Sequence, residues 1–145
     1  MIINGARARK IKNSRGEETI EVEINKCKAS SPSGKSTGKY ETKPWHKNVD
    51  WNVKFLNSVY FSIEIKNFDD LKKIENFIKR KLKFKNAKEF GANSLFALES
   101  AILKALAKEQ KKELGKLLIQ EQDNCLFLLE MQLVEGYIHI IKISQ

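Results

Sequence analysis

Hydrophobic and polar residues alternate strictly over residues 19–25, where every second side chain is apolar and β-branched. This two-residue period is typical of a β-strand with one buried and one exposed face. The preceding residues 2–12 have a weaker extended pattern, and the polar segment 13–17 predicts a turn that makes the pair antiparallel. A tight turn at residues 25–26 leads into a third short strand over residues 27–31, so the pattern predicts a three-stranded antiparallel meander.

The pattern becomes helical in the middle of the chain. Residues 49–59 carry apolar side chains three or four positions apart, a spacing that continues to Tyr60. A second amphipathic segment, residues 68–78, follows Asn67 and Asp69, either of which can cap a helix. Both segments predict surface helices with one buried face.

A third helix is predicted over residues 94–118, which have a well-defined apolar stripe. Asn93 is its expected N-cap, and Gly115 is expected to mark a break into a last short turn. Residues 124–145 are rich in β-branched and long apolar side chains on both sides of Glu135–Gly136, which predicts a β-hairpin. The predicted fold class is therefore α+β, in a single domain spanning residues 1–145.

Composition adds a strongly basic balance to this picture. The chain has 27 lysines and arginines against 18 acidic residues, a net charge of +9, and only four of the basic residues are arginines. Such a balance raises the chance of a polyanionic partner. Cys27 and Cys125 lie far apart with no neighbouring histidine, which gives zinc no support and favours a reducing compartment. We find no signal-type or membrane-spanning apolar run, so we expect a cytoplasmic protein that does not bind membranes.

The stretch Gly34–Ser36 has the G-K-S ending of a phosphate-binding loop. That motif needs an earlier glycine, where this chain has Ala29, and a helix immediately afterwards. Turn-favouring residues follow Pro32, and Lys43–Pro44 disfavours helix because the residue before a proline avoids helical geometry. The stretch is therefore predicted to be a mobile loop and not a nucleotide site.

Three separated motifs, in the same order, resemble the enolases. "ARARKIKNSRGEETIEVEI" resembles their opening strand, S-R-G turn and second strand; "PSGKSTGKYE" resembles their P-S-G-A-S-T-G-x-x-E loop; "KEFGANSLFALESAILKALA" resembles their K-L-G-A-N-A-I-L-G-V-S-L-A helix. The resemblance covers about residues 2–118 and implies the N-terminal capping domain of that family. Residues 124–145 diverge from it.

The chain also departs from the family pattern. The barrel that carries the magnesium-binding carboxylates and the acid–base groups for 2-phosphoglycerate does not follow residue 118, and Thr42–His46 replace the E-L-R-D stretch after the loop. The chain is thus not expected to be an enzyme by itself, because a function requires a complete site and not only a fold.

Within the loop, the resemblance implies that Ser36 would ligate a second, substrate-linked magnesium when a barrel is present; the alternative is one loop serine among several. Lys35 stands where the family has a small apolar residue. It would bind an anion, repel magnesium, or remain a solvated lysine. The loop residues concerned are Ser33, Gly34, Lys35, Ser36, Thr37 and Gly38.

Two further groups of residues are candidates for binding. Arg9, Arg15 and Glu21 align with family positions near the subunit interface, and the alternative is a cross-strand ion pair. A cationic run with an interleaved aromatic residue is a candidate anion-binding or nucleic-acid-binding surface, although most such runs are solvated helix ends. The run comprises Lys79, Arg80, Lys81, Lys83, Phe84 and Lys85, with Lys88 nearby.

The histidines are isolated, and neither His46 nor His139 has a carboxylate or cysteine at catalytic or metal-ligand spacing. Trp45 and Trp51 are expected to pack beneath the segment after the loop, with a small pocket at Trp45 and His46 as the alternative. Two hypotheses follow. The chain is the loop-donating part of a split enolase, or it is a non-catalytic module that binds another protein or a nucleic acid; self-association is compatible with both.

Overall fold

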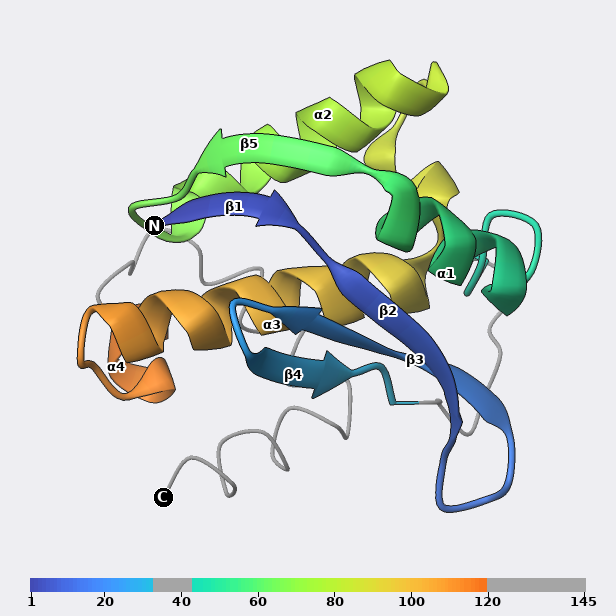
Figure 1. Cartoon of the computed structure of the whole chain (residues 1–145), viewed down its shortest axis with the longest axis horizontal. Helices are drawn as coiled ribbons and strands as arrows, with labels where there is room; N and C mark the ends of the chain where they lie inside the picture. Colours follow the sequence, from blue (N-terminus) through green and yellow to red (C-terminus); the bar gives the residue numbers. More distant parts are fainter. Residues whose placement is uncertain (33–42, 120–145) are drawn as a thin grey trace.

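The computed structural model describes residues 1–32 and 43–119. The predicted loop at residues 33–38 and the predicted hairpin at residues 124–145 lie outside the described residues. The described part alternates strands and helices in an α+β arrangement (Figure 1).

The predicted three-stranded meander is present. Strands β2 (Arg7–Lys12), β3 (Glu18–Ile24) and β4 (Cys27–Ser30) form an antiparallel sheet in the order β2-β3-β4. Asn25 and Lys26 connect β3 to β4 with φ angles of 48° and 68°, the left-handed conformation that a tight two-residue hairpin turn requires. The tight turn and its register are therefore confirmed.

The extended segment over residues 2–12 is not one strand, as the pattern predicted, but two. Strand β1 (Ile2–Gly5) leaves the meander and pairs antiparallel with β5 (Tyr60–Glu64), forming a separate two-stranded sheet. The helical spacing that continued to Tyr60 was misleading, because Val59 has extended backbone angles and ends the preceding helix. Strand β5 lies more than fifty residues from β1 in the sequence, so no local pattern indicated this pairing.

The predicted helices are confirmed with shifted ends. Helix α1 (Val49–Ser58) begins after Asn48, whose side chain accepts a hydrogen bond from the Trp51 N–H at 2.8 Å. Asn67 caps the short 3₁₀ turn η1 (Phe68–Asp70) through a reciprocal capping box with Asp70, which leads into α2 (Leu71–Leu82). Of the two proposed caps, the structure uses Asn67.

Helix α3 (Ala92–Glu109) follows the short 3₁₀ turn η2 (Ala87–Phe90) and begins after Gly91, so Asn93 lies inside its first turn and is not the N-cap. The helix ends before Gln110, and Lys111 adopts a left-handed φ of 54°. The break thus comes before Gly115, which lies inside α4 (Leu114–Ile119).

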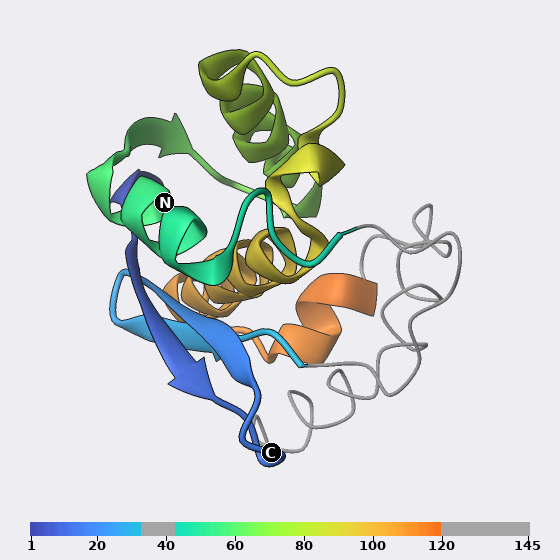
Figure 2. The same cartoon turned by 90° about the vertical axis from the view of Figure 1, so that its right-hand side faces the viewer.

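Helix α3 is the centre of the molecule. It packs on β3 and β4 on one side, and η2 and α4 also contact it, whereas α1 covers β2 and α2 lies against β5 (Figures 1 and 2). Leu98, Ile102 and Leu106 on α3 are fully buried, as are the three alternating apolar residues of β3. Burial around almost the whole circumference explains why this helix is rich in alanine and leucine.

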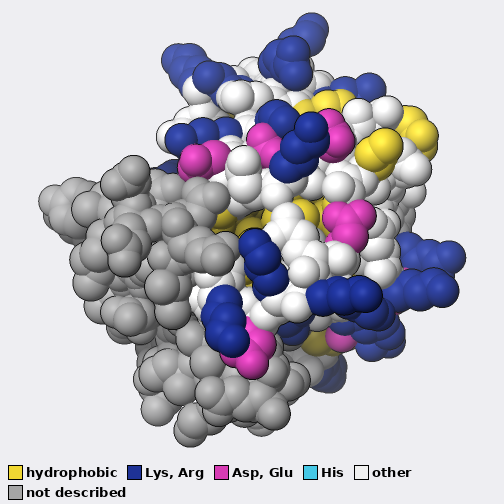
Figure 3. Space-filling model, turned by 90° about the vertical axis from the view of Figure 1, so that its left-hand side faces the viewer, with side chains coloured by type: hydrophobic (Ala, Val, Ile, Leu, Met, Phe, Trp, Pro, Cys, Tyr) yellow, Lys and Arg dark blue, Asp and Glu magenta, His cyan; other side chains and the backbone are white. Residues whose placement is uncertain are grey.

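The described surface is predominantly basic. On the face shown in Figure 3, lysine and arginine side chains are spread over the described part, with fewer acidic side chains among them. Among residues 1–32 and 43–119, no helix is long and apolar enough to cross a membrane.

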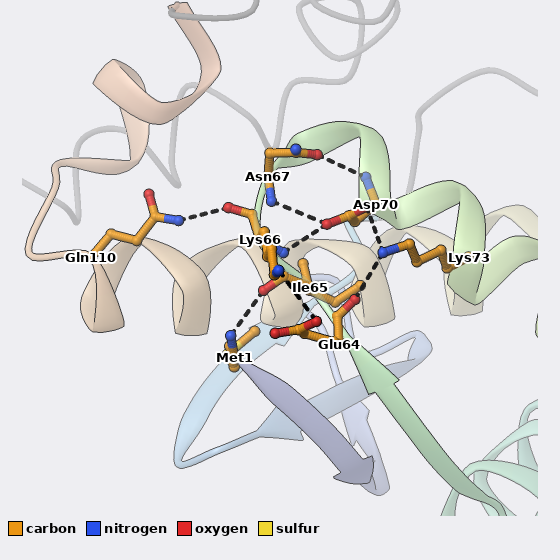
Figure 4. Close-up of polar contacts among 8 residues, drawn as sticks. All are labelled: Met1, Glu64, Ile65, Lys66, Asn67, Asp70, Lys73 and Gln110. Carbon is orange, nitrogen blue, oxygen red and sulfur yellow. Dashed lines mark hydrogen bonds and ion pairs between the residues drawn. The ribbon is translucent and has the colours of Figure 1, made fainter.

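The first residue is joined to Ile65, directly after β5 (Figure 4), and also to the end of α3. The Met1 amino group donates to the Ile65 carbonyl at 2.9 Å and lies 3.1 Å from a Glu109 carboxylate oxygen, while the Ile65 N–H donates to the Met1 carbonyl at 2.7 Å. The Gln110 side chain donates to the Lys66 carbonyl at 2.7 Å. These bonds fasten the two-stranded sheet to the C-terminal end of the central helix.

Candidate functional site

The residues on the upstream side of the 33–38 loop are held on the meander. The Ser31 N–H donates to the Ile20 carbonyl at 3.2 Å, and the buried Thr19 hydroxyl donates to the Ser31 carbonyl at 2.9 Å. Ser31 is therefore tied to the central strand from both its amide and its carbonyl.

The downstream side is held by the N-terminus of α3. The Lys43 carbonyl accepts from the Ala92 N–H at 2.8 Å, and the Pro44 carbonyl accepts from the Asn93 N–H at 3.2 Å. These are first-turn N–H groups, which have no partner within a helix. The segment that follows the loop thus replaces the side-chain cap that α3 lacks.

Gly91 makes this contact sterically feasible. Its φ is +107°, and a Cβ at this position would lie 2.5 Å from the Pro44 carbonyl oxygen and 2.6 Å from the Trp45 Cα. Both atoms belong to backbone, so neither can move away cheaply. The glycine of the G-A-N motif is explained by this close approach.

Asn52 links the segment at His46 to the residues at the start of α3 through hydrogen bonds. It is fully buried, and its amide nitrogen donates to the Phe90 carbonyl at 2.6 Å and to the Ser94 hydroxyl at 2.8 Å, while its oxygen accepts from the His46 N–H at 3.1 Å. Sequence reasoning overlooked Asn52. The signal was available, because Asn52 lies between Val49 and Leu56 at helical spacing, on the buried face of α1.

The two tryptophans pack against the core, as expected. Trp45 and Trp51 are half-buried against the core. The His46 ring lies 4.7 Å from the rings of both Trp51 and Phe84, measured between centroids. His46 also lines an open cavity of about 540 Å³, together with Lys43, Asn86, Lys88 and Glu89.

The cationic run occupies the last turn of α2 and the turn that follows it. Its lysines and arginine are all exposed, and none forms an ion pair with a described residue. Phe84 is half-buried with its ring against His46, so it is only partly available to stack on a base. Positive charge at a helix C-terminus also complements the helix dipole, which is the ordinary role of such residues.

Arg9 and Glu21 are paired across β2 and β3, with the Arg9 Nε 2.7 Å from a Glu21 carboxylate oxygen. The hydrogen bond that Arg9 donates to Glu21, reinforced by the charge of that carboxylate, raises the pKa of Arg9. The cross-strand ion pair is therefore confirmed. Arg15 is exposed in the turn between the strands, and a role for these residues at a subunit interface stays a prediction.

Glu99 is a second polar residue that sequence reasoning overlooked. Its side chain lies in α3 with 7% of its surface exposed, and its Oε1 atom has no hydrogen-bond partner. Burial, followed by the charge of Glu75 and a hydrogen bond with it, raises the pKa of Glu99 well above 4.5. The sequence did indicate this burial, because Glu99 lies within the apolar stripe of the helix predicted over residues 94–118.

Together, the meander, the segments fastened on both sides of the 33–38 loop and the helix that starts at G-A-N define a capping domain of the enolase type. Among the described residues, no group of three or more histidine, cysteine, aspartate or glutamate side chains is placed to hold a metal ion.

The comparison with known proteins agrees. The chain belongs to the family "Enolase, N-terminal domain", whose model matches residues 3–118. It is 36% identical over 121 residues to the enolases of Ehrlichia ruminantium strains Gardel and Welgevonden, in matches that cover 72% of this chain. The match spans only 28% of the length of those enolases, which makes the activity of the whole enzyme a matter for proposal.

Proposed function

We propose that this domain donates the 33–38 loop to an enolase barrel carried on another chain, and that the two together catalyse the magnesium-dependent dehydration of 2-phosphoglycerate. The observation that carries the proposal is the fastening of both flanks of the loop, Ser31 to β3 and Lys43–Pro44 to the start of α3. A loop that must close over a substrate needs fixed ends, because its closure otherwise costs conformational entropy.

In this proposal Ser36 supplies oxygen ligands to a magnesium ion that is shared with the substrate phosphate. Magnesium prefers oxygen ligands and is commonly bound by one or two carboxylates together with phosphate and water. The carboxylates come from the barrel, since the described residues hold no cluster suited to a metal. Lys35 next to Ser36 adds a positive charge, which favours phosphate and disfavours magnesium.

The test is reconstitution. This chain is mixed with an enolase barrel that lacks its own capping domain, and formation of phosphoenolpyruvate is followed with and without magnesium. We expect turnover only in the magnesium-containing mixture. Ser36→Ala should lower the rate at least tenfold, whereas the matched loop variant Ser33→Ala should retain it. Absence of both complex formation and turnover, with barrels that bind other capping domains, would refute the proposal.

A second candidate function, a non-catalytic module that binds a nucleic acid, is favoured by the exposed cationic run at residues 79–85. Phosphate contacts release counterions, so binding should weaken steeply as salt increases. We would measure binding of a single-stranded RNA between 50 and 200 mM salt, for the chain and for Lys79→Gln/Lys83→Gln/Lys85→Gln. Absence of binding at low salt removes this candidate and leaves the loop-donating function untouched.

A further inference from the structure

The cavity beside His46 is assembled from two separate stretches of the chain. Lys43 and His46 come from the segment that caps α3, and Asn86, Lys88 and Glu89 come from the turn η2. Its volume of about 540 Å³ falls within the range of about 300–1,000 Å³ that is usual for small-molecule sites. Two of the lining residues are lysines and one, Glu89, is a carboxylate. Lys85 directly precedes the lining residue Asn86 in the sequence.

Two acceptor atoms of this lining are already bonded to backbone. The Glu89 Oε1 atom accepts from the N–H groups of Lys85 at 2.9 Å and Asn86 at 3.1 Å, and the Asn86 Oδ1 atom accepts from the Lys88 N–H at 2.9 Å. These bonds belong to the capping box at the start of η2. Asn86 also has an amide NH₂, which can only donate.

His46 has one ring nitrogen fixed by the scaffold. Its Nδ1 lies 3.2 Å from the Glu89 carbonyl oxygen, which can only accept, so Nδ1 carries the hydrogen in this contact. Trp51 and Phe84 hold the ring on its two neighbouring sides, each at 4.7 Å between centroids. The other nitrogen, Nε2, is then an acceptor in the neutral ring, so it can accept the hydrogen of a protonated phosphate oxygen but cannot donate to an ionised one.

The two lysines are uncompensated. Neither Lys43 nor Lys88 forms an ion pair with a residue in the described part of the chain, and both are exposed. A cavity lined by two lysines and an asparagine is suited to an oxyanion, because charge-assisted hydrogen bonds to phosphate are stronger than neutral ones. Lysine commonly binds phosphate in this manner, as a point charge.

From this arrangement we infer that the cavity lined by Lys43, His46, Asn86 and Lys88 binds a phosphate group, either as free phosphate or as part of a small phosphate ester. The inference does not depend on the proposed loop-donating function. Two of these lining residues, Lys43 and His46, lie in the stretch Thr42–His46, where the enolases have a different sequence. The Lys43 carbonyl meanwhile caps α3, so a ligand held by its ammonium would lie directly against the anchor of the loop.

The two tryptophans of the chain provide the readout, since Trp45 adjoins His46 in sequence and the Trp51 ring lies 4.7 Å from the His46 ring between centroids. Intrinsic fluorescence is followed while inorganic phosphate replaces chloride at constant ionic strength, and separately while glycerol 3-phosphate is added. We expect a saturable change with phosphate. A tighter response to glycerol 3-phosphate would identify an ester as the ligand class, and an equal response would identify free phosphate.

The decisive variant is Lys43→Gln/Lys88→Gln, which should weaken phosphate binding at least tenfold. The matched control, Lys12→Gln/Lys72→Gln, removes two exposed lysines from other elements and should bind as the unmodified chain does. The thermal midpoint of each variant establishes that it is folded. Backbone amide shifts of Asn86 and Lys88 in NMR spectra should follow the same titration.

Three results would overturn the inference. One is a fluorescence change that chloride reproduces at the same ionic strength. Another is an equal loss of affinity in both double variants, which would show an effect of net charge alone. The third is binding of a single-stranded RNA without any saturable response to phosphate, which would move the anion site to the run at residues 79–85.

Discussion

Gly91 lies so close to Pro44 that a Cβ added to the glycine would be 2.5 Å from the proline carbonyl oxygen. This contact joins the start of the central helix to the segment that follows the 33–38 loop. The atoms in contact belong to the backbone of Pro44 and Trp45, so position 91 tolerates little besides glycine.

Gly91→Ala should therefore lower the free energy of unfolding by about 2 kcal/mol or more, since it adds both a clash and backbone strain at φ +107°. Urea unfolding measures the loss. Gly16→Ala is the matched control, because its φ of +77° is also left-handed but nothing lies within 4 Å, and it should cost about 1 kcal/mol. Equal losses at the two positions would show that the Pro44 contact is not tight.

Asn52→Ala should destabilise the domain by about 2–4 kcal/mol, because three buried or half-buried partners lose their hydrogen bonds at once. Ser94→Ala, which removes only one of these bonds, should cost roughly 1 kcal/mol. Chemical denaturation followed by tryptophan fluorescence measures both. If the two substitutions have the same cost, Asn52 does not organise the region in the way that its contacts indicate.

Glu99 should make the domain less stable as the pH rises. Its pKa is raised in the folded state, so below about pH 4.5 the carboxyl is protonated in both states, whereas above it the unfolded chain ionises first. The cost grows by about 1.4 kcal/mol per pH unit until the folded carboxyl also ionises. Glu99→Gln should thus stabilise the domain at pH 8 and have little effect at pH 4.

The measurement is the free energy of unfolding of both proteins across that pH range. Glu113→Gln is the control for the same chemical change at the surface, since Glu113 has 69% of its side chain exposed. A pH-independent difference for Glu99→Gln would mean that Glu99 ionises in the folded state without penalty.

Asp70 should act with the opposite sign. Burial raises the pKa of this carboxyl, but the hydrogen bond from Lys73 at 2.8 Å and those from the Lys66 and Asn67 N–H groups outweigh it and hold the pKa below 3.8. Its contribution is therefore complete above pH 3.8 and is lost as the pH falls through the folded pKa.

Asp70→Ala should cost about 1 kcal/mol at pH 7, the usual effect of losing a hydrogen bond, and less at pH 2.5. Asp70→Asn retains a neutral acceptor and should cost less than the alanine at pH 7. Thermal unfolding at the two pH values measures both variants. A loss for Asp70→Ala that is unchanged at pH 2.5 would contradict a role for the carboxylate charge.

Local signals predicted much of the fold. The alternation over β3 and the turn at Asn25–Lys26 were predicted correctly, and Asn67 was one of the two caps that the sequence offered, because each depends on residues within a few positions of one another. The errors share a different cause. Strand β5 requires β1 as its partner, and the start of α3 requires the carbonyls of Lys43 and Pro44, which no neighbouring residue reveals.

The candidate site divides in the same way. Residue types and the resemblance to the enolases predicted the loop, the G-A-N motif and the cationic run, and the loop itself lies outside the described residues. Asn52 and Glu99 had a signal in the helical pattern that was overlooked, whereas the cavity at Lys43 and Lys88 had none, because it depends on packing between distant segments.

The amino-acid sequence by itself thus determined the α+β class, the meander and the resemblance to an enolase capping domain, since periodicity and motif order are written along the chain. Tertiary structure alone decided that β1 leaves the meander for β5, that Gly91 lies against Pro44, and that two lysines distant in sequence line one cavity. The physical reason is that hydrophobic burial and backbone hydrogen bonding act between surfaces, and those surfaces exist only after distant segments have come together.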